Sequence, residues 1–262
     1  MSDTPQVAVV GMGLWMDGFP SVPAWSLRRS DAEAIKPTGK AFDRVNRRRA
    51  GKLGRAIADA AAEAMEQGQV DPATISTVVG SSIGEATTMI GLLDQMWRDK
   101  TPMSPAAFTV SVHNAASGLL SISNKNQGFT TSLAADEDTP GTALLEGIGL
   151  VLDRQLPALV VCADEAAPIK LLKQADNWEL MAIAVILAPI DAEHLHLARL
   201  QVAPGGSATL APAELPRELE HNPQAGILNL VDAVLRGAPG SVRLDRGTGA
   251  GYTARLAFDT AS

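Results

Sequence analysis

Three consecutive acidic residues, Asp136, Glu137 and Asp138, stand between an apolar segment and a proline in the stretch TSLAADEDTPGTA, residues 131–143. The apolar segment predicts a strand and the residues from Pro140 onward predict a helix. Strand-to-helix turns often carry the nucleophile of α/β enzymes, because a helix N-terminus stabilises negative charge. The same residues also suit a plain helix start, since Asp and Thr are favoured N-caps and Pro fits the first helical position. Composition alone favours the helix start.

Few other residues are candidates for chemistry. None of the four histidines, His113, His194, His196 and His221, belongs to a helical metal-binding pattern with a nearby carboxylate. His194 and His196 flank the start of a predicted strand, so we expect them to be solvated. The single cysteine, Cys162, lies within the apolar stretch ALVVCADEA. A thiol in a buried strand has a raised pKa and serves as a small core side chain; we therefore expect no catalytic thiolate, no metal site and no cofactor.

Two glycines, Gly11 and Gly13, follow the first apolar segment in VVGMG. A dinucleotide-binding loop would need a third glycine where Met16 stands, and a helix directly after it. Neither is present in the sequence, so we do not expect a dinucleotide site.

Apolar segments alternate with amphipathic ones along most of the chain. The expected strands are residues 7–10, 76–80, 130–135, 157–163 and 180–187. The expected helices are residues 44–68, with an Ala-rich face for close packing, a segment from the glycine turn of VVGSSIGEA towards residue 98, a segment around 115–118 that follows an extended stretch beginning at residue 106, and residues 139–154. This alternation predicts an α/β fold, a layered sheet covered by helices on both faces.

The remaining C-terminal part has a different pattern. It predicts a strand at 195–202, a Pro- and Gly-rich loop at 204–216, and a helix at 225–236. Two further strands, 242–246 and 252–258, are expected to form a hairpin around GTGAG, because glycine supplies the positive φ angles of such turns.

Composition sets limits on the function. The chain has 262 residues, of which 46% are hydrophobic, so it can bury a sizeable core. A net charge of −7 argues against nucleic acid as the main partner. The lone cysteine fits a reducing cytoplasm. The N-terminal residues do not form a signal peptide, and no apolar run reaches the roughly 18 residues of a membrane span. We expect a soluble, cytoplasmic protein.

The order of these segments resembles the N-terminal half of β-ketoacyl synthases, which have the thiolase fold. The resemblance covers about residues 5–190 and rests on several stretches together. These are VAVVGMG, FDRVNRRRAGKLGRAIADAAAEA, VVGSSIGEA, VSVHNAASGLLSISNKNQG, TTSLAAD and ALVVCADEA. It implies a thiolase-like N-terminal half over residues 1–190 and a reduced, truncated second half, residues 191–262, packed on it.

The resemblance implies that the acidic turn corresponds to the nucleophile position of the family. In the family, the strand before this turn ends in a small residue followed by the nucleophilic cysteine. Counted from Gly128, that position is Glu137, and Cys162 lies too far downstream to substitute. A carboxylate here is favoured by the helix N-terminus as a thiolate would be, but an acyl anhydride on it would hydrolyse readily. The nucleophile position is therefore degenerate, and no catalytic residue is assigned.

The histidines of active family members come from their second half, which is mostly missing here. The segment EHNPQAGILNLVDAVL is similar to a family Gly-His segment, but Glu220 replaces the glycine and the spacing is shorter. Whether His221 has a site role stays open.

Some family members lack the cysteine and pair with an active ketosynthase, as the chain-length factors of polyketide systems do. The chain looks most like the short subunits of this type in aryl polyene or related pigment synthesis. The resemblance implies a heterodimer, or a homodimer, that shapes the tunnel for an acyl chain borne on an acyl carrier protein, which is reached through the partner. The expected substrate or interface residues are Phe108, Val112, His113, Asn114, Thr131, Ser132, Ala134, Asp136 and Asp138.

Two alternatives remain. Some relatives with Gln at the cysteine position decarboxylate malonyl groups, but the charge of Glu137 would repel the malonyl carboxylate and the enolate formed from it. The chain is otherwise a stand-alone acyl-binding homodimer without a ketosynthase partner. Acyl chain length, headgroup, pathway product and the orientation of Glu137 do not follow from the sequence.

Overall fold

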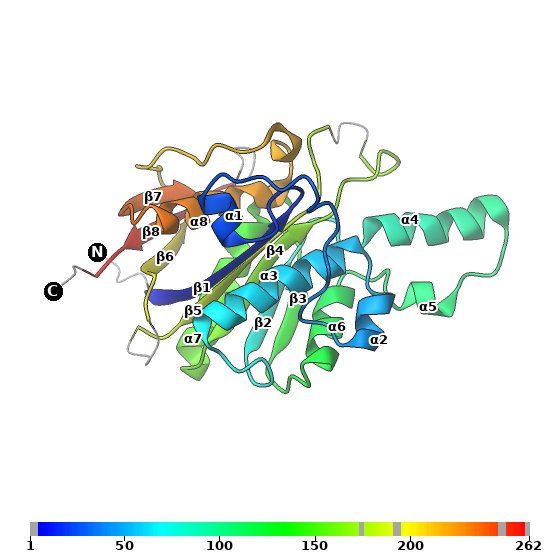
Figure 1. Ribbon diagram of the computed structural model, residues 1–262, viewed down its shortest axis with the longest axis horizontal. Coiled ribbons are helices and arrows are strands. Elements are labelled where there is room, and N and C mark those ends of the chain that lie inside the picture. The colour runs from blue at the N-terminus through cyan, green and yellow to red at the C-terminus, as the bar shows by residue number, and fades with distance from the viewer. Residues whose placement is uncertain (1–4, 173–175, 191–194, 246–249, 260–262) are drawn as a thin grey trace.

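The computed structural model describes residues 5–172, 176–190, 195–245 and 250–259 (Figure 1). Eight strands within these residues form one mixed sheet in the order β3-β2-β4-β5-β1-β6-β8-β7. The strands are β1 (Val7–Met16), β2 (Ser76–Gly80), β3 (Thr130–Leu133), β4 (Ala158–Asp164), β5 (Met181–Ala188), β6 (Ala198–Pro204), β7 (Gly240–Arg243) and β8 (Tyr252–Ala257). Strand β2 is parallel to β3 and β4, and the other neighbouring strands are antiparallel.

Helices cover both faces of this sheet, as the sequence predicted (Figure 1). The α-helices are α1 (Val22–Ser26), α2 (Arg44–Arg49), α3 (Lys52–Gly68), α4 (Ala86–Asp94), α5 (Pro105–Phe108), α6 (Ala115–Ser123), α7 (Thr139–Arg154) and α8 (Ile227–Leu235). A π-helical turn, η1 (Gln95–Asp99), extends α4, and 3-10 turns occur at η2 (Asp136–Asp138), η3 (Arg217–Leu219) and η4 (Pro223–Gly226).

The core divides at the sheet, because side chains of a strand alternate between its faces. Along β5, Ile183 and Val185 belong to the core under α7 and α8, whereas Ala184 and Ile186 belong to the core under α3 and α6. The α3 side is built largely from alanines, which lets the helix approach the sheet closely. The predicted Ala-rich packing face is thus confirmed.

Strand β1 is longer than predicted and continues through both glycines to Met16. The reason is close packing rather than ligand binding. A Cβ on Gly13 would lie 1.9 Å from the Ala60 carbonyl oxygen of α3, and one on Gly11 would lie 2.3 Å from that of Ala64. The absence of side chains at Gly11 and Gly13 therefore allows α3 to pack directly against β1.

The single helix predicted for residues 44–68 is two helices. The chain turns at Ala50, whose ψ of 136° ends α2, and Gly51 begins the next helix. A Cβ on Gly51 would lie 2.7 Å from a carboxylate oxygen of Glu85, so the glycine makes room for that side chain.

The segment from residue 106, predicted to be extended, begins instead as helix α5. Ser104 is its N-cap, accepting a hydrogen bond from the Ala107 amide at 3.2 Å, and Pro105 takes a first-turn position. These are ordinary helix-start residues. The alternation of apolar and polar residues in FTVSV, residues 108–112, favoured the extended prediction instead.

The C-terminal strands continue the sheet that the preceding part of the chain begins. Strand β6 pairs with Val7–Val9 of β1, and β8 and β7 follow it outward. The predicted hairpin is confirmed as β7 and β8, while most of its turn lies outside the described residues. None of the described helices has the length and apolar character needed to cross a membrane.

Candidate functional site

The candidate site lies where the parallel strands β3, β2 and β4 end. In α/β sheets, the loops that leave the carboxyl ends of parallel strands meet at one edge and commonly form the functional site. Here β3 leads into the acidic turn η2, β2 leads into Ser81 and Ser82, and β4 ends at Asp164. Residues far apart in sequence are thereby brought together.

The backbone of the acidic turn is held by a threonine. The buried Thr139 hydroxyl donates to the Asp136 carbonyl oxygen (2.7 Å) and accepts from the Ala135 amide (2.9 Å). Asp136 is exposed and has a φ of 52°, in the left-handed region that Asp tolerates better than most residues. Helix α7 begins at Thr139, as predicted.

The acidic side chains do not cap α7 as the sequence suggested. Asp138 occupies the N-cap position but makes no side-chain capping bond. Its carboxylate instead accepts from the amides of Ala250 (2.8 Å) and Gly251 (2.9 Å) before β8. Close packing reinforces this contact, since a Cβ on Gly141 would lie 2.3 Å from the Tyr252 ring. Asp138 therefore tethers the turn to the C-terminal hairpin.

Glu137 is the central residue of η2 and is half-buried. The residues on either side of it have structural contacts: the Asp136 carbonyl accepts hydrogen bonds and the Asp138 carboxylate holds the hairpin. A carboxylate at this place accepts hydrogen bonds but carries acyl groups poorly.

A buried polar network supports the turn from below. Asp164 is fully buried; its Oδ1 accepts from Ser81 Oγ (2.5 Å) and the Ile83 amide (3.1 Å), and its Oδ2 accepts from the Ser82 amide (3.1 Å) and Gln224 Nε2 (2.8 Å). Burial raises the pKa of the Asp164 carboxyl, and the four donors oppose that rise.

Ser82 connects this network to the acidic turn. Its hydroxyl donates to the Asp136 carbonyl (3.0 Å) and accepts from Gln224 Nε2 (2.9 Å). The loop after β2, the turn η2 and the turn η4 are therefore one hydrogen-bonded unit. Such a unit rigidifies the strand ends.

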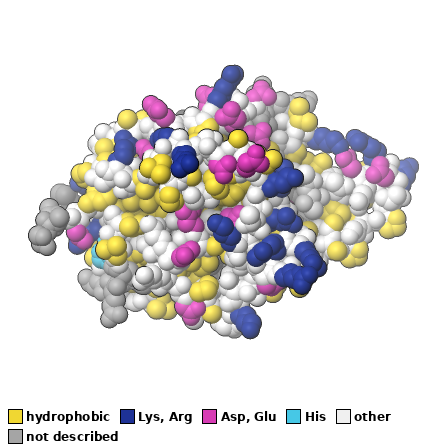
Figure 2. All heavy atoms as spheres, in the orientation of Figure 1, with side chains coloured by type: hydrophobic (Ala, Val, Ile, Leu, Met, Phe, Trp, Pro, Cys, Tyr) yellow, Lys and Arg dark blue, Asp and Glu magenta, His cyan; other side chains and the backbone are white. Residues whose placement is uncertain are grey.

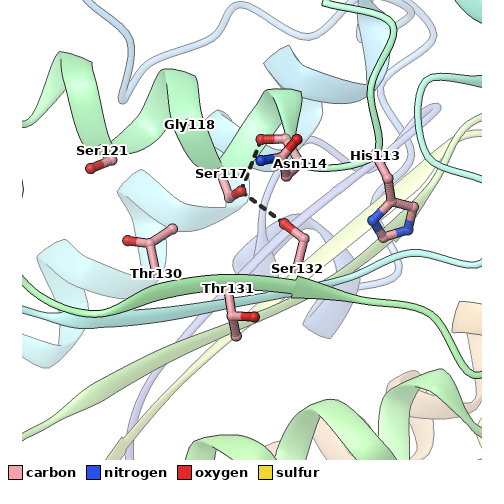
Figure 3. A pocket seen from close by; sticks show the side chains of 8 residues that line it. All are labelled: His113, Asn114, Ser117, Gly118, Ser121, Thr130, Thr131 and Ser132. Carbon is pink, nitrogen blue, oxygen red and sulfur yellow. Dashed lines mark hydrogen bonds between the residues drawn. The ribbon is translucent and has the colours of Figure 1, made fainter.

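A groove of about 530 Å³ opens beside the edge strand β3 (Figure 3). Its lining is polar and comes from β3, α6 and the residues just before α6. The lining residues are His113, Asn114, Ser117, Gly118, Ser121, Thr130, Thr131 and Ser132. None of them is an acid, a lysine or an arginine, so the groove suits neutral hydrogen-bonding groups or the backbone of another chain.

Hydroxyl contacts join the two walls of this groove. Ser117 donates to the Asn114 carbonyl (3.0 Å) and shares a hydrogen bond with the Ser132 hydroxyl (2.8 Å). Figure 3 shows Thr130 and Ser132 pointing from β3 toward α6, whereas Thr131 points to the other side of the strand. The Thr130 hydroxyl is buried and has no hydrogen-bond partner within the described residues.

The structure brings together four of the residues selected from the sequence. His113, Asn114, Thr131 and Ser132 line the groove, and the His113 Nε2 atom lies 2.7 Å from the Ser81 carbonyl oxygen. Ala134 follows directly after β3 and is exposed.

Phe108 and Val112 are not among the residues that line the groove. Phe108, at the end of α5, is 54% exposed and Val112 is 39% exposed, so both offer apolar surface to another molecule.

Sequence reasoning missed Ser117, Ser121 and Thr130 of the groove. Their signal was present: Asn114, Ser117 and Ser121 recur at helical spacing, and Thr130 and Ser132 alternate along a strand. It also missed Gln224, which had no local signal because its partners lie more than fifty residues away.

The cysteine and the other histidines within the described residues do not line the groove. Cys162 is fully buried, and burial, with a contribution from Asp164, raises its thiol pKa far above the ordinary value. His221 is exposed, with its Nδ1 atom 2.6 Å from the Asp176 carbonyl. His196 was expected to be solvated, but only 15% of its side chain is exposed and it faces Asp259; His194 lies outside the described residues. No group of three or more His, Cys, Asp or Glu side chains in the described part is placed to hold a metal ion.

The surface carries one marked basic cluster despite the net negative charge. Helix α2 has the sequence RVNRRR, and Figure 2 shows Lys and Arg side chains gathered where that helix lies. All four arginines of α2 are exposed, and Arg47 is also hydrogen-bonded to the Gly39 and Phe42 carbonyls. This face would attract an acidic partner.

Comparison with known proteins identifies the family and the fold. Residues 23–242 match the profile of the family described as beta-ketoacyl synthase, N-terminal domain. A chain of the complex of the ketosynthase ApeO with its chain length factor ApeC, from Xenorhabdus doucetiae, is similar over 97% of this chain and 99% of that chain, with 18% identity and a TM-score of 0.70. No curated protein matches the chain.

Two further solved structures agree. A chain of AntDE:AntF, a type II polyketide synthase acyl-carrier protein in complex with its ketosynthase bound to the hexaketide, is similar over 98% of this chain and 100% of that chain, with 12% identity and a TM-score of 0.67. The ishigamide ketosynthase/chain length factor is similar over 76% and 67%, with 14% identity and a TM-score of 0.60. At these identities the likeness establishes the thiolase-like fold that the sequence predicted. With most of its length matched by the family profile, the chain belongs to the β-ketoacyl synthase family and corresponds to its N-terminal domain.

Proposed function

We propose that the protein is a non-condensing, chain-length-factor-type subunit that pairs with a cysteine-bearing ketosynthase and shapes its acyl tunnel. One observation carries the proposal: the open edge strand β3 leads directly into the turn where the family resemblance places the nucleophile, and Glu137 occupies that position. The chain thus keeps a surface for a partner strand and lacks the group that performs condensation.

The two edges of the sheet differ in how they are protected. At the far edge, the segment before η3 runs along β7: the amides of Thr209 (2.9 Å) and Leu210 (3.1 Å) both donate to the Ser241 carbonyl. At the near edge, β2 is the only strand neighbour of β3 within the described residues. Strand addition is therefore favoured at β3.

Hydrogen-bond directions along β3 identify the groups available to a partner. The amides of Thr77 and Ser81 donate to the carbonyls of Phe129 and Leu133. The backbone groups of the odd-numbered residues of β3 therefore face β2. Backbone groups alternate in direction along a strand. The amide and carbonyl of Thr130 and Ser132 therefore point outward.

Condensation by this chain is disfavoured on chemical grounds. The reaction needs a nucleophile that forms a thioester and later releases the acyl group. Cys162 is inaccessible, and Glu137 would form an anhydride. The partner must therefore supply the thiolate, and the acyl carrier protein delivers its substrates to that partner.

In this proposal, the chain contributes residues to the wall of the acyl tunnel. Phe108 and Val112 present apolar surface, and His113, Asn114, Thr131 and Ser132 present polar surface, close to the proposed interface. In this proposal, Phe108 and Val112 limit how far an acyl chain extends, while Ala134, Asp136 and Asp138 shape the end of the interface.

Co-expression with the ketosynthase encoded nearest to this chain tests the proposal. We expect a stable one-to-one complex, whose ketosynthase loses activity or chain-length control when this chain is omitted. If the chain purifies alone as a stable monomer, and the ketosynthase works equally well without it, the proposal is wrong. A self-associated dimer that ignores the ketosynthase would favour the homodimer alternative.

A pair of variants isolates the strand contact. Ser132→Pro removes an outward-facing amide without removing a donor to β2, whereas Ser132→Ala keeps the amide and removes the same side-chain hydroxyl. We expect Ser132→Pro to weaken copurification of the ketosynthase and Ser132→Ala to retain it. Equal behaviour of both variants would argue against strand pairing.

A further inference from the structure

A second hollow lies beside β1, beyond the point where β6 begins opposite Val9. The two strands pair only at Val7–Val9, after which β1 continues to Met16 without β6 beside it. The resulting wedge has a volume of about 570 Å³, within the range of small-molecule sites. It is lined by β1, α1, α3 and the end of α8, and is distinct from the groove beside β3.

Side chains of α3 take over the hydrogen bonds that β6 no longer makes. The Met12 amide donates to Gln67 Oε1 (2.7 Å), and the Leu14 amide donates to Glu63 Oε2 (2.9 Å). Glu63 also accepts from the Val22 amide at the start of α1, at 2.9 Å. The carboxylate thereby holds one wall of the wedge open at a fixed width.

The carboxylate of Glu63 makes no ion pair within the described residues. It is half-buried, and its hydrogen bonds come from neutral backbone amides. Burial raises the pKa of Glu63, and the charge of Lys40, which does not line the wedge, opposes that rise. Glu66, also in the lining, is exposed and adds a second negative charge. The cation nearest in sequence to α1, Arg28, is paired with Asp232 (3.1 Å) and stacks on the Trp25 ring, and it is not among the lining residues.

Most of the remaining lining is apolar. Met12, Val22, Pro23, Leu27 and Leu235 line the wedge together with the polar Ser26 and Gln67, and Leu27 is 72% exposed. Figure 2 shows hydrophobic side chains gathered where α1 lies, with acidic side chains between α1 and α3. An apolar hollow with anionic groups and no basic lining residue fits a ligand that is apolar along its body and cationic at one end.

We propose that this wedge binds an amphiphilic amine, with its hydrocarbon part against Leu27, Met12 and Leu235 and its ammonium group near Glu63 and Glu66. Charge complementarity favours a cation, and the volume of about 570 Å³ is that of a small-molecule site. The site does not depend on the proposed ketosynthase pairing, because none of its lining residues belongs to β3, η2 or the groove.

Calorimetric titration of the purified chain with three ligands of equal chain length tests the site. Octylammonium should bind saturably with one-to-one stoichiometry, 1-octanol more weakly by about two- to fivefold, and octanoate more weakly still. Equal binding of octanoate and octylammonium would overturn the proposal, as would binding at many equivalent sites.

Exposed positions allow variants that should not disturb folding. Glu66→Gln should weaken octylammonium binding by about two- to fivefold, and Leu27→Ser should weaken octylammonium and octanol alike by about tenfold. Asp153→Asn removes an equal charge from an exposed position on α7 and is the matched control. An equal loss in Asp153→Asn would show non-specific attraction to an acidic protein and would overturn the site. A rise in molecular mass on titration would assign the hollow to contact between copies of the chain instead, and would also overturn it.

Discussion

Replacing Glu85 with Gln should clearly reduce the pH dependence of stability between pH 5 and 8. Glu85 is 5% exposed and lies against the start of α3, near Gly51. Burial, and then the charge of Glu165, raise the pKa of Glu85 from 4.5 to about 7, while the Gly54 amide opposes the rise. The folded protein therefore holds a proton that the unfolded chain has released.

The sign and size follow from this shift. A carboxyl whose pKa is raised by folding stabilises the protein fully below its unfolded pKa, and that contribution is lost as pH rises through the folded pKa. The window here runs from about pH 4.5 to about pH 7. The difference between the unfolded and folded pKa values corresponds to a loss of about 3 kcal/mol in the free energy of unfolding, at about 1.4 kcal/mol per pKa unit.

Urea unfolding followed by tryptophan fluorescence at pH 5, 6, 7 and 8 measures the effect. The wild type should lose stability across this range, and Glu85→Gln should lose much less, so that the variant becomes the more stable protein at pH 8. Asp153→Asn, at an exposed position, should follow the wild type. Because burial also raises the pKa of Glu165, the two carboxyls titrate as a coupled pair, and Glu165→Gln should flatten the profile partly. Parallel profiles for wild type and Glu85→Gln would refute the reasoning.

Three further predictions concern packing and accessibility. Gly13→Ala should destabilise the protein by about 2 kcal/mol or more, measured by urea unfolding, because its Cβ would meet the α3 backbone. Asp138→Ala should cost about 2 kcal/mol and increase hydrogen exchange at the amides of Ala250 and Gly251, whereas Asp138→Asn should cost less because it retains one acceptor oxygen. Cys162 should react with a thiol reagent such as Ellman's only after denaturation; rapid labelling of the native protein would contradict its burial.

Local sequence signals predicted the presence of helices and strands better than the residues at which they begin and end. Alternating apolar segments and helix-start residues located most strands and helices, since those patterns depend on neighbouring residues. Strand β1 was cut short because glycines weaken strands in general. Its continuation depends on the approach of α3, which lies more than forty residues further along the chain.

The break between α2 and α3 shows the same limitation. Residues 44–68 have helical periodicity throughout, yet the chain turns at Ala50 and Gly51. The room at Gly51 is taken by the carboxylate of Glu85, which no window around residue 50 contains. A buried side chain from a distant loop decided the boundary.

For the candidate site too, the sequence predicted some features and not others. The family resemblance selected residues on β3 and before α6, and His113, Asn114, Thr131 and Ser132 do meet in one groove. The acidic turn was predicted in the right place, but the partner of Asp138 was not, because the hairpin amides lie more than a hundred residues away. Contacts of this range are set by the order of strands in the sheet, which periodicity does not encode.

The composition of β3 supports the proposal that this edge strand pairs with a strand of another chain. Exposed edge strands are normally protected by being very short, or by charged residues, proline, bulges or a covering segment. Strand β3 is short, at four residues, but has none of the other devices within the described part of the chain. Strand β3, with the sequence TTSL, contains neither charge nor proline, and its register with β2 is unbroken. The opposite edge of the same sheet, β7, is covered by the segment containing Thr209. A chain that protects one edge and leaves the other uncharged and regular is suited to a partner that supplies the missing strand. Under the proposed function, Glu137, four residues beyond the end of β3, would stand at the nucleophile position beside an interface that pairs with a ketosynthase.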